Sequence, residues 1–330
     1  MKRRWLYFFL AAALLIAACL CARYILLRLD DTPSLPEQAE RRYVVILPHD
    51  TLGQTEQLCQ ALYDTADQLG VYVQIITVSN FDEQSNEIYR AIYSGFDGMI
   101  IMPIGQPDAD QTSQVFDDLE AAMPCVMLLD RLDRENVSFC LASDDAIGEI
   151  AVQELLDAGF EDGDSLHIFI GSRADSRAND RATEFTRALE RRGLHVTDTL
   201  SIDVNIISSD ERIKEYIREN HVRYVFCADA LSTIAAAKCA STDRYSKPSI
   251  IGCGFDEEHL EYFQSGSLYS LISIDYARMG VSALQRLNFY CQTGTLPADY
   301  DLCLRVYDET HPKGQSYLWS DVKRLQSVQP

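Results

Sequence analysis

The sequence is poor in basic residues. Its 29 lysines and arginines stand against 50 aspartates and glutamates, which gives a formal net charge of −21 at pH 7. Nucleic acids are bound through concentrated positive charge, and no helix-turn-helix pattern or Lys/Arg-rich cluster precedes the globular part of this chain. The composition therefore excludes a nucleic-acid-binding protein.

The sequence also lacks the short motifs of common enzyme and cofactor sites. It has no GxSxG elbow, P-loop or HExxH helix. It has no dinucleotide fingerprint either, because the glycine-rich fragment Gly252–Gly254 lacks a third glycine and a following acidic residue. None of the ten cysteines forms a CxxC pair or has a histidine at metal-ligand spacing. We therefore expect no enzyme, no metal site and no cofactor.

Several cysteines lie in strand-like apolar runs such as PCVMLL, VSFCLA and YVFCAD. Cysteine in such a setting behaves as a small buried hydrophobic residue, so we expect free thiols. Export from the cytoplasm would also permit disulfides, and the sequence indicates no connectivity.

One long hydrophobic run stands at the N-terminus. Three basic residues at positions 2–4 precede an apolar stretch from Trp5 to Ala22, which extends to Leu27 if Arg23 reaches the lipid surface. A membrane-spanning helix needs about 20 apolar residues, and the basic start places the N-terminus in the cytoplasm. We expect residues 1–28 to be a membrane anchor or signal segment, and residues 29–42 a short linker.

Two alternatives to an uncleaved anchor remain open. The segment could be a cleaved signal peptide. Its residues Ile16–Cys19 also resemble a bacterial lipobox, in which Cys19 would carry the lipid. Each alternative exports the body of the protein, so we expect the globular part to be extracytoplasmic, at the cell membrane.

From Tyr43 onward, apolar runs alternate with helical patterns. The runs are rich in β-branched residues and are not interrupted by polar ones; they include YVVILP, VYVQIITV, GMIIMP, CVMLL, LHIFIG, VRYVFCA, PSIIGCG and SLYSLISI. Such runs are typical of parallel strands that are covered on both faces by helices. With 330 residues available, we predict an α/β fold with two doubly wound parallel-sheet lobes.

Polar residues follow several of these apolar strands. Asp130 and Arg131 come after CVMLL, Arg181 lies in the segment after LHIFIG, Asp229 follows YVFCA, and Asp256 follows IIGCGF. In open α/β sheets the carboxyl ends of the strands face the crevice where ligands bind. If both sheets face one cleft, these five residues converge there; otherwise they are strand-end ion pairs or helix caps.

Arg173, Arg177 and Arg181 recur every four residues. At a helix N-terminus they could clamp a phosphate or carboxylate. Acidic residues are interleaved with them at 175, 180 and 184, however, and this spacing favours a salt-bridged helix face.

The order of these motifs resembles the periplasmic sugar-binding family, which includes ribose- and galactose-binding proteins and the ligand core of lactose-repressor-type regulators. The resemblance covers about Tyr43 to Val306. It is carried by YVVILP…ADQLG, GFDGMIIMP, LLDR…ASDD, the Arg181-x-x-x-Phe185 spacing, VFCAD, GFD and ARMG at Ala277–Gly280.

This resemblance implies a type 1 periplasmic binding protein fold, in which a hinge of three chain crossings joins the lobes. We expect the crossings near Ala142–Asp144, Ile274–Tyr276 and Pro297–Leu302. The implied N-terminal lobe is 43–143 plus 275–300 and the C-terminal lobe is 144–274 plus 301–308, with an irregular tail at 309–330.

The resemblance also implies which residues contact the ligand. In the family, the residues matching Asp130, Arg131, Arg181, Asp229 and Asp256 hydrogen-bond the ligand. Carboxylates and guanidinium groups offer paired acceptors or donors that suit the adjacent hydroxyls of a polyol.

Some family positions differ in this chain. Gln54 and Thr55 fall where aromatic side chains would stack on a sugar ring, and Asn179 replaces a second arginine. The family's Gln or Asp before the last crossover is Ile274 here, with Asp275 next to it, so Asp275 is a further candidate. His49 and Asp50, at the end of the first strand, and Gln54 just after them could supply contacts in place of the aromatics.

We therefore predict a membrane-tethered, extracytoplasmic binding protein that closes on a small polar solute, a sugar or polyol. Its partners would be an ABC-type permease or a membrane sensor kinase. The alternative is an interaction module of the same fold that does not bind small molecules.

Overall fold

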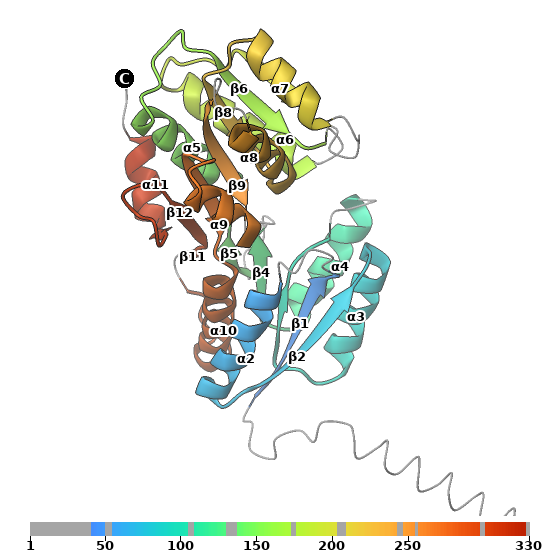
Figure 1. Cartoon of the computed structure of the whole chain (residues 1–330). Helices are drawn as coiled ribbons and strands as arrows, with labels where there is room; N and C mark the ends of the chain where they lie inside the picture. Colours follow the sequence, from blue (N-terminus) through green and yellow to red (C-terminus); the bar gives the residue numbers. More distant parts are fainter. Residues whose placement is uncertain are drawn as a thin grey trace, which may run out of the picture.

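Figure 1 shows the computed structural model of the chain, which describes residues 41–49, 55–104, 109–129, 137–172, 176–202, 209–242, 247–254, 257–297 and 301–327. The predicted anchor or signal segment, residues 1–28, lies outside these ranges, as does most of the predicted linker. Among the helices that the structure describes, none is both long enough and apolar enough to cross a membrane.

The N-terminal lobe is built on a six-stranded parallel sheet with the order β11-β5-β4-β3-β1-β2. Its strands are β1 (Arg42–Pro48), β2 (Tyr72–Val78), β3 (Gly98–Ile101), β4 (Cys125–Leu129), β5 (Val137–Leu141) and β11 (Asp301–Leu302). The helices around this sheet are α2 (Glu56–Leu69), α3 (Phe81–Tyr93), α4 (Ala109–Ala122) and α10 (Tyr276–Thr293).

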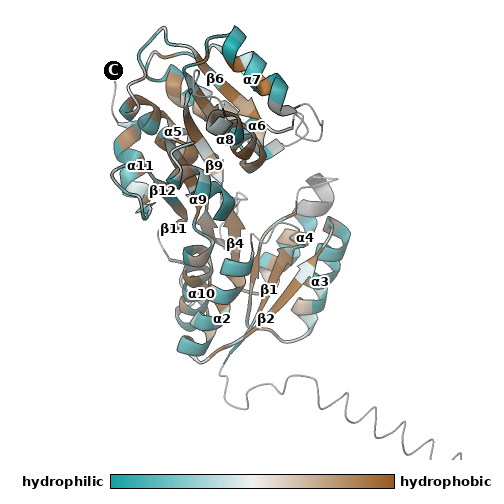
Figure 2. Cartoon of the chain, viewed as in Figure 1, coloured by the Kyte–Doolittle hydropathy of each residue, from teal (hydrophilic) through white to brown (hydrophobic). Residues whose placement is uncertain are grey.

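Strand β1 shows why the apolar runs are continuous. Tyr43, Val45 and Leu47 are fully buried in the core beneath α2 and α10, whereas Val44 and Ile46 are fully buried beneath α3 and α4. Successive side chains of a strand point to opposite faces, so a strand covered on both faces has no solvent-facing positions. Figure 2 accordingly shows the strands largely brown and the outer sides of the helices largely teal.

The C-terminal lobe contains a seven-stranded sheet with the order β13-β12-β10-β9-β8-β6-β7. Its strands are β6 (Leu166–Ile170), β7 (Asp198–Ser201), β8 (Tyr224–Cys227), β9 (Ser249–Gly254), β10 (Ser270–Ile274), β12 (Leu304–Tyr307) and β13 (Gln315–Tyr317). Strands β12 and β13 are antiparallel to their neighbours and the others are parallel. The helices are α5 (Asp144–Asp157), α6 (Ser176–Glu190), α7 (Ser209–Glu219), α8 (Ala230–Thr242), α9 (Glu257–Gln264) and α11 (Trp319–Gln326).

Helices α5 and α6 lie unusually close together. A Cβ atom on Gly148 of α5 would lie 2.9 Å from backbone atoms of Glu184 and Phe185 on α6. Only glycine leaves room for this approach. The contact fixes α6, which carries Arg181, against the first helix that follows the hinge.

The chain passes between the lobes three times. It crosses after β5 at residues 142–143, between β10 and α10 at Asp275, and between β11 and β12 at Cys303. The third crossing lies beyond the predicted Pro297–Leu302 stretch, because β11 pairs with β5 of the first sheet. The expectation that the C-terminal lobe resumes at residue 301 is therefore wrong by two residues.

The predicted irregular tail, 309–330, is also wrong over much of its length. Strand β13 pairs with β12, and α11 packs on α5 with Val322 fully buried. Arg192 of the turn after α6 donates to the carbonyl of Leu325 at 2.9 Å. The C-terminal segment thus completes the second lobe.

The eight cysteines in the described ranges are all free thiols. Six are buried and two, Cys59 and Cys291, are partly exposed. The prediction of buried free thiols is confirmed for the cysteines of the three strand-like runs, Cys125, Cys140 and Cys227. Cys19 and Cys21 lie outside the described residues.

Candidate ligand-binding site

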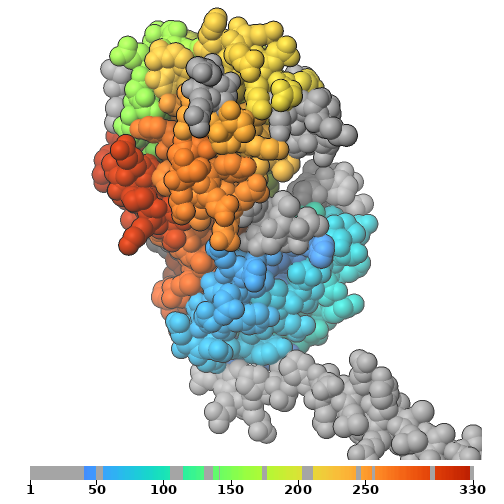
Figure 3. All heavy atoms as spheres, in the orientation of Figure 1, coloured from blue at the N-terminus to red at the C-terminus, as the bar shows by residue number. Residues whose placement is uncertain are grey.

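A cavity of about 240 Å³ lies at the carboxyl ends of the C-terminal lobe's parallel strands. It is bordered by the ends of β9 and β10, by the start of α8 after β8, and by the first turns of α6. The charged and polar residues that line it are Arg177, Arg181, Asp229 and Ser273; the others are Ile147, Ala178, Ala230, Leu231, Cys253, Gly254, Ile272, Ile274, Tyr276 and Leu304. Figure 3 shows this lobe, coloured green to red, above the largely blue to cyan N-terminal lobe.

Arg181 is held firmly at the edge of the cavity. Its Nε donates to Oδ1 of Asp144 at 3.0 Å, and its Nη1 donates to the carbonyl of Ala228 at 2.7 Å. The side chain is 14% exposed. Burial opposes its charge, but the nearby carboxylates of Asp144 and Asp229 favour it, and the pKa of Arg181 is raised. The guanidinium is therefore charged and oriented.

The pairing of Arg181 differs from the predicted salt-bridged face of α6. The partner of Arg181 is Asp144, on the neighbouring helix α5, whereas Glu184 pairs with Arg187. Helical spacing identifies possible partners within one helix and contains no information about the helix packed beside it. Arg173 and Asp175 lie outside the described residues.

Asp229 lies beside Arg181 and caps α8. Its Oδ1 accepts from the backbone N–H of Ser232 at 2.8 Å, and its Oδ2 accepts from Gly171 at 2.7 Å. These bonds join the ends of β6 and β8 at the mouth of the cavity. A carboxylate has about four acceptor positions, so a capping Asp229 can still accept from a ligand hydroxyl.

Asp275 does not line the cavity. Its Oδ1 accepts from the backbone N–H of Arg278, which caps α10, and its Oδ2 accepts from Nη2 of Arg305 at 2.6 Å. Its own N–H donates to the carbonyl of Cys303 at 2.9 Å. Asp275 therefore ties the second and third crossings together, and Ile274 beside it faces the cavity instead.

The other predicted contacts belong to the N-terminal half of the site or to loops. His49 is exposed at the end of β1, where its N–H donates to the carbonyl of Val78 at 2.7 Å. Asn179 lines a separate groove beside β7 rather than this cavity. The remaining predicted residues, Asp50, Gln54, Asp130, Arg131 and Asp256, lie outside the described residues.

The backbone is strained just before Asp130. Leu129, the last residue of β4, has φ of 68°. Left-handed backbone is uncommon for residues other than glycine and tends to occur at functional sites. The backbone at the end of β4 is therefore held in an unfavourable conformation by the surrounding fold.

Three features of the cavity were not apparent from the sequence. In the sequence, Asp144 marks only the hinge, and Cys253 is only part of a glycine-rich fragment. Burial raises the pKa of the Cys253 thiol to about 12, so this group faces the cavity as a neutral thiol. Ser273, one residue from a predicted position, supplies a hydroxyl.

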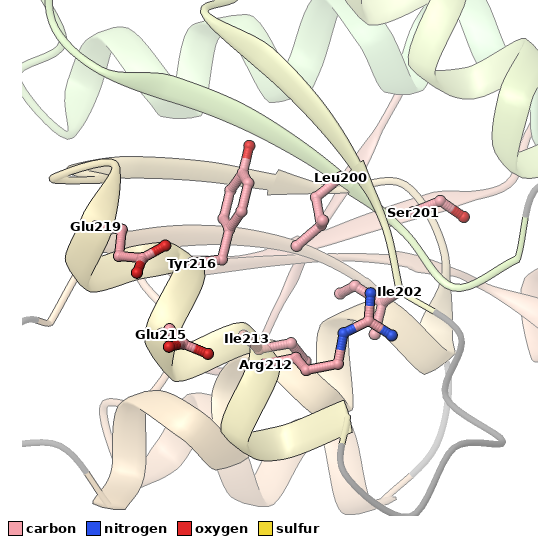
Figure 4. Close-up of a pocket in the computed structure, with 8 residues that line it drawn as sticks. All are labelled: Leu200, Ser201, Ile202, Arg212, Ile213, Glu215, Tyr216 and Glu219. Carbon is pink, nitrogen blue, oxygen red and sulfur yellow. The ribbon is translucent and has the colours of Figure 1, made fainter.

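A second cavity lies away from the hinge, between β7 and α7 (Figure 4). It is lined by Leu200, Ser201, Ile202, Arg212, Ile213, Glu215, Tyr216 and Glu219. The Tyr216 hydroxyl points away from Arg212 and Glu215 in Figure 4, and it is hydrogen-bonded to Asp198 and His167, each at 2.9 Å. None of the predicted ligand contacts that the structure describes lines it.

Two α/β lobes, three crossings and a polar cavity beside them define the class of two-lobed binding proteins. Residues 43–294 match the family described as periplasmic binding protein domain. The chain belongs to this family, and the predicted family resemblance is confirmed.

Solved structures share the fold over most of their length. A carbohydrate transporter solute-binding protein from Agrobacterium radiobacter, in complex with D-arabinose, has 17% identity and a TM-score of 0.66, and the match covers 87% of this chain and 99% of that one. A periplasmic ribose ABC transporter protein from Conexibacter woesei has 17% identity and a TM-score of 0.68, and the match covers 88% of this chain and 96% of that one. A glucose-galactose binding protein from Geobacillus stearothermophilus has 18% identity and a TM-score of 0.66, and the match covers 82% of this chain and 98% of that one. No curated protein matches the chain.

Proposed function

We propose that this protein is a membrane-tethered, extracytoplasmic solute-binding protein whose lobes close on a small polar ligand, a sugar or polyol. The observation that supports this most is the meeting of Arg181 and Asp229 at one cavity beside the hinge. Ile274, Tyr276 and Leu304, which flank the second and third crossings, also line that cavity. A ligand there would contact groups whose positions change as the lobes move.

The chemistry of the cavity suits a sugar. Arg181 and Asp229 offer charged donors and acceptors to hydroxyl groups, while Ile147, Leu231 and Ile272 offer apolar surface to the C–H faces of a ring. The structural relatives that carry arabinose, ribose and glucose-galactose descriptions support this ligand class. Family membership also supports a binding protein over an enzyme.

Ligand binding would act by shifting the balance between open and closed lobes. A ligand that contacts both lobes makes its full set of contacts only in the closed form, and so it stabilises that form. The predicted N-terminal half of the site, with Asp130 and Arg131, would supply the second set of contacts. The closed form would then be recognised by an ABC-type permease or by a membrane sensor kinase. An uncleaved anchor with a short linker, if the chain has one as we propose, would favour the kinase.

A screen of neutral sugars and polyols by thermal unfolding and calorimetry tests the ligand proposal. A true ligand at a hundredfold excess over its dissociation constant should stabilise the protein by about 2.7 kcal/mol. Arg181→Ala should weaken binding by about a hundredfold, because it removes charge-assisted hydrogen bonds. Arg187→Ala is the matched control, since it removes an exposed arginine of the same helix.

A specific observation favours the alternative, an interaction module without a small-molecule ligand. Arg181 and Asp229 already have internal partners, so neither requires a ligand to be satisfied. The screen separates the two functions: stabilisation by none of the sugars or polyols would favour the module and contradict the ligand proposal.

The tether proposal has its own test. An alkaline phosphatase fusion after Arg42 should be active, because the basic residues before Trp5 retain the N-terminus in the cytoplasm. A β-galactosidase fusion at the same point should be inactive. Activity of only the cytoplasmic reporter would overturn the proposed topology. The intact mass of the membrane-extracted chain separates an uncleaved anchor from a chain cleaved or lipidated at Cys19.

A further inference from the structure

Asp144 occupies a central position between the hinge and the cavity. It is the first residue of α5, directly after the first crossing at residues 142–143. Its side chain is 28% exposed and its Oδ1 accepts from Nε of Arg181. One contact therefore joins the hinge to the group that we propose binds the ligand.

Two hydrogen bonds fix the orientation of the Arg181 guanidinium before any ligand binds. A guanidinium has five N–H donors in one plane, and two bonds, to Asp144 and to the carbonyl of Ala228, fix the orientation of that plane. Since Ala228 precedes Asp229, the same bonds set the distance between Arg181 and the capping carboxylate. A ligand meets a guanidinium that is already oriented and does not have to order it, which lowers the entropic cost of binding.

The charges at the cavity also cancel. Arg177, Arg181 and Asp229 are the charged side chains that line it among the described residues, and Asp144 is bonded to Arg181. Two positive and two negative charges sum to zero. An anionic ligand at Arg181 would lie close to the carboxylate of Asp144, and repulsion between like charges is strong where water is excluded.

We propose that Asp144 is a positioning residue for Arg181 and that, by cancelling its charge, it selects neutral over anionic ligands. This rests on the proposed function, because it concerns the same cavity. It also argues against an anion clamp in the arginine-rich segment, because Arg181 would be a neutralised contact for a polyol.

The test compares matched ligand pairs on the full-length protein and on Asp144→Asn. D-galactose with D-galacturonate, and D-glucose with D-glucuronate, differ only in whether a CH₂OH group or a carboxylate is present. The wild type should bind the neutral member of a pair at least about tenfold more tightly. Asp144→Asn should bind the neutral sugar about tenfold more weakly and should reduce or invert the preference, because it leaves the charge of Arg181 uncompensated.

Two control variants separate positioning from a general effect of charge. Asp145→Asn makes the same change one residue along α5, where the nearby charges are Glu184 and Glu149 rather than Arg181; it should leave the preference unchanged. Asp144→Glu retains the charge and should restore much of the preference. An unchanged preference in Asp144→Asn, or a wild type that prefers the uronates, would overturn the inference and leave the proposed function intact.

A readout without ligand keeps the two proposals separate. In nitrogen-15-labelled protein, the Nε–H signal of Arg181 should exchange slowly with water, and Asp144→Asn should accelerate this exchange about tenfold or more, whereas Asp145→Asn should not. Equal exchange in wild type and Asp144→Asn contradicts the positioning role. If no sugar binds, the proposed function and the selectivity both fail, and the exchange measurement alone decides the positioning role.

Discussion

Replacing Glu149 with glutamine is expected to lower the free energy of unfolding by about 3–5 kcal/mol, the usual effect of breaking a buried ion pair. Glu149 lies on α5 and is fully buried. It pairs with Arg191 and with Arg192, whose Nη2 lies 2.8 Å from Oε2. The Arg192 side chain is only 8% exposed, so its charge would remain buried without a counter-charge.

The effect should extend to the C-terminal helix. Arg192 also donates to the carbonyls of Ala188 and Leu325, and so it links α6 to α11. Loss of Glu149 should therefore speed hydrogen exchange in α11 more than in the N-terminal lobe. Urea unfolding measures the global change, and exchange followed by mass spectrometry measures the local one.

Two further variants test the reason for this loss. Glu184→Gln breaks an exposed Glu–Arg pair on α6 and should change stability by no more than about 0.5 kcal/mol. Glu149→Leu combined with Arg192→Met removes both buried charges and should recover much of the loss. If the double variant is as unstable as Glu149→Gln, the cause is not the unpaired charge.

Replacing Glu154 with glutamine is expected to stabilise the protein above pH 7 and to have little effect near pH 4.5. Glu154 is 3% exposed. Burial, with a further contribution from the charge of Asp308, raises its pKa from 4.5 to about 7. The folded state thus holds the proton more tightly than the unfolded state. The stability linked to this proton is fully present below pH 4.5 and is lost as the pH rises towards 7.

A pKa raised from 4.5 to about 7 corresponds to about 3 kcal/mol of stability, since one pKa unit is 1.36 kcal/mol. Stability measured by urea unfolding should fall across this range in the wild type and stay flatter in Glu154→Gln. Glu219→Gln, at an exposed site on α7, should retain the wild-type slope. An equal slope in Glu154→Gln would show that another group carries the dependence.

The alternation of strands and helices was predictable because its physical signal is local. A strand such as β1, buried on both faces, must be apolar at every position, and YVVILP satisfies this requirement without reference to its neighbours. Helix starts and ends carry similar local signals, such as Gly70 and Gly294 in left-handed conformation after α2 and α10. The two-lobed α/β class and the position of Asp229 after β8 follow from such patterns.

The elements that the sequence analysis missed are short or polar. Strand β13 has three residues and α11 has eight, and Val322 of α11 is fully buried. Such segments show too little periodicity to be recognised alone, and they are stabilised by contacts with β12 and α5. The two-residue strand β11, which moves the third crossing to Cys303, was missed for the same reason.

The sequence alone determined the class of fold and the acidic character of the chain, because each depends on composition or on neighbours along the chain. Only the tertiary structure decided that Arg181 pairs with Asp144, that Asp275 joins two crossings rather than facing the cavity, and that Glu149 binds two arginines. The residues of these ion pairs lie between 30 and 43 positions apart in sequence. Ion pairs over such separations depend on which helix packs against which strand, and no local pattern contains that information.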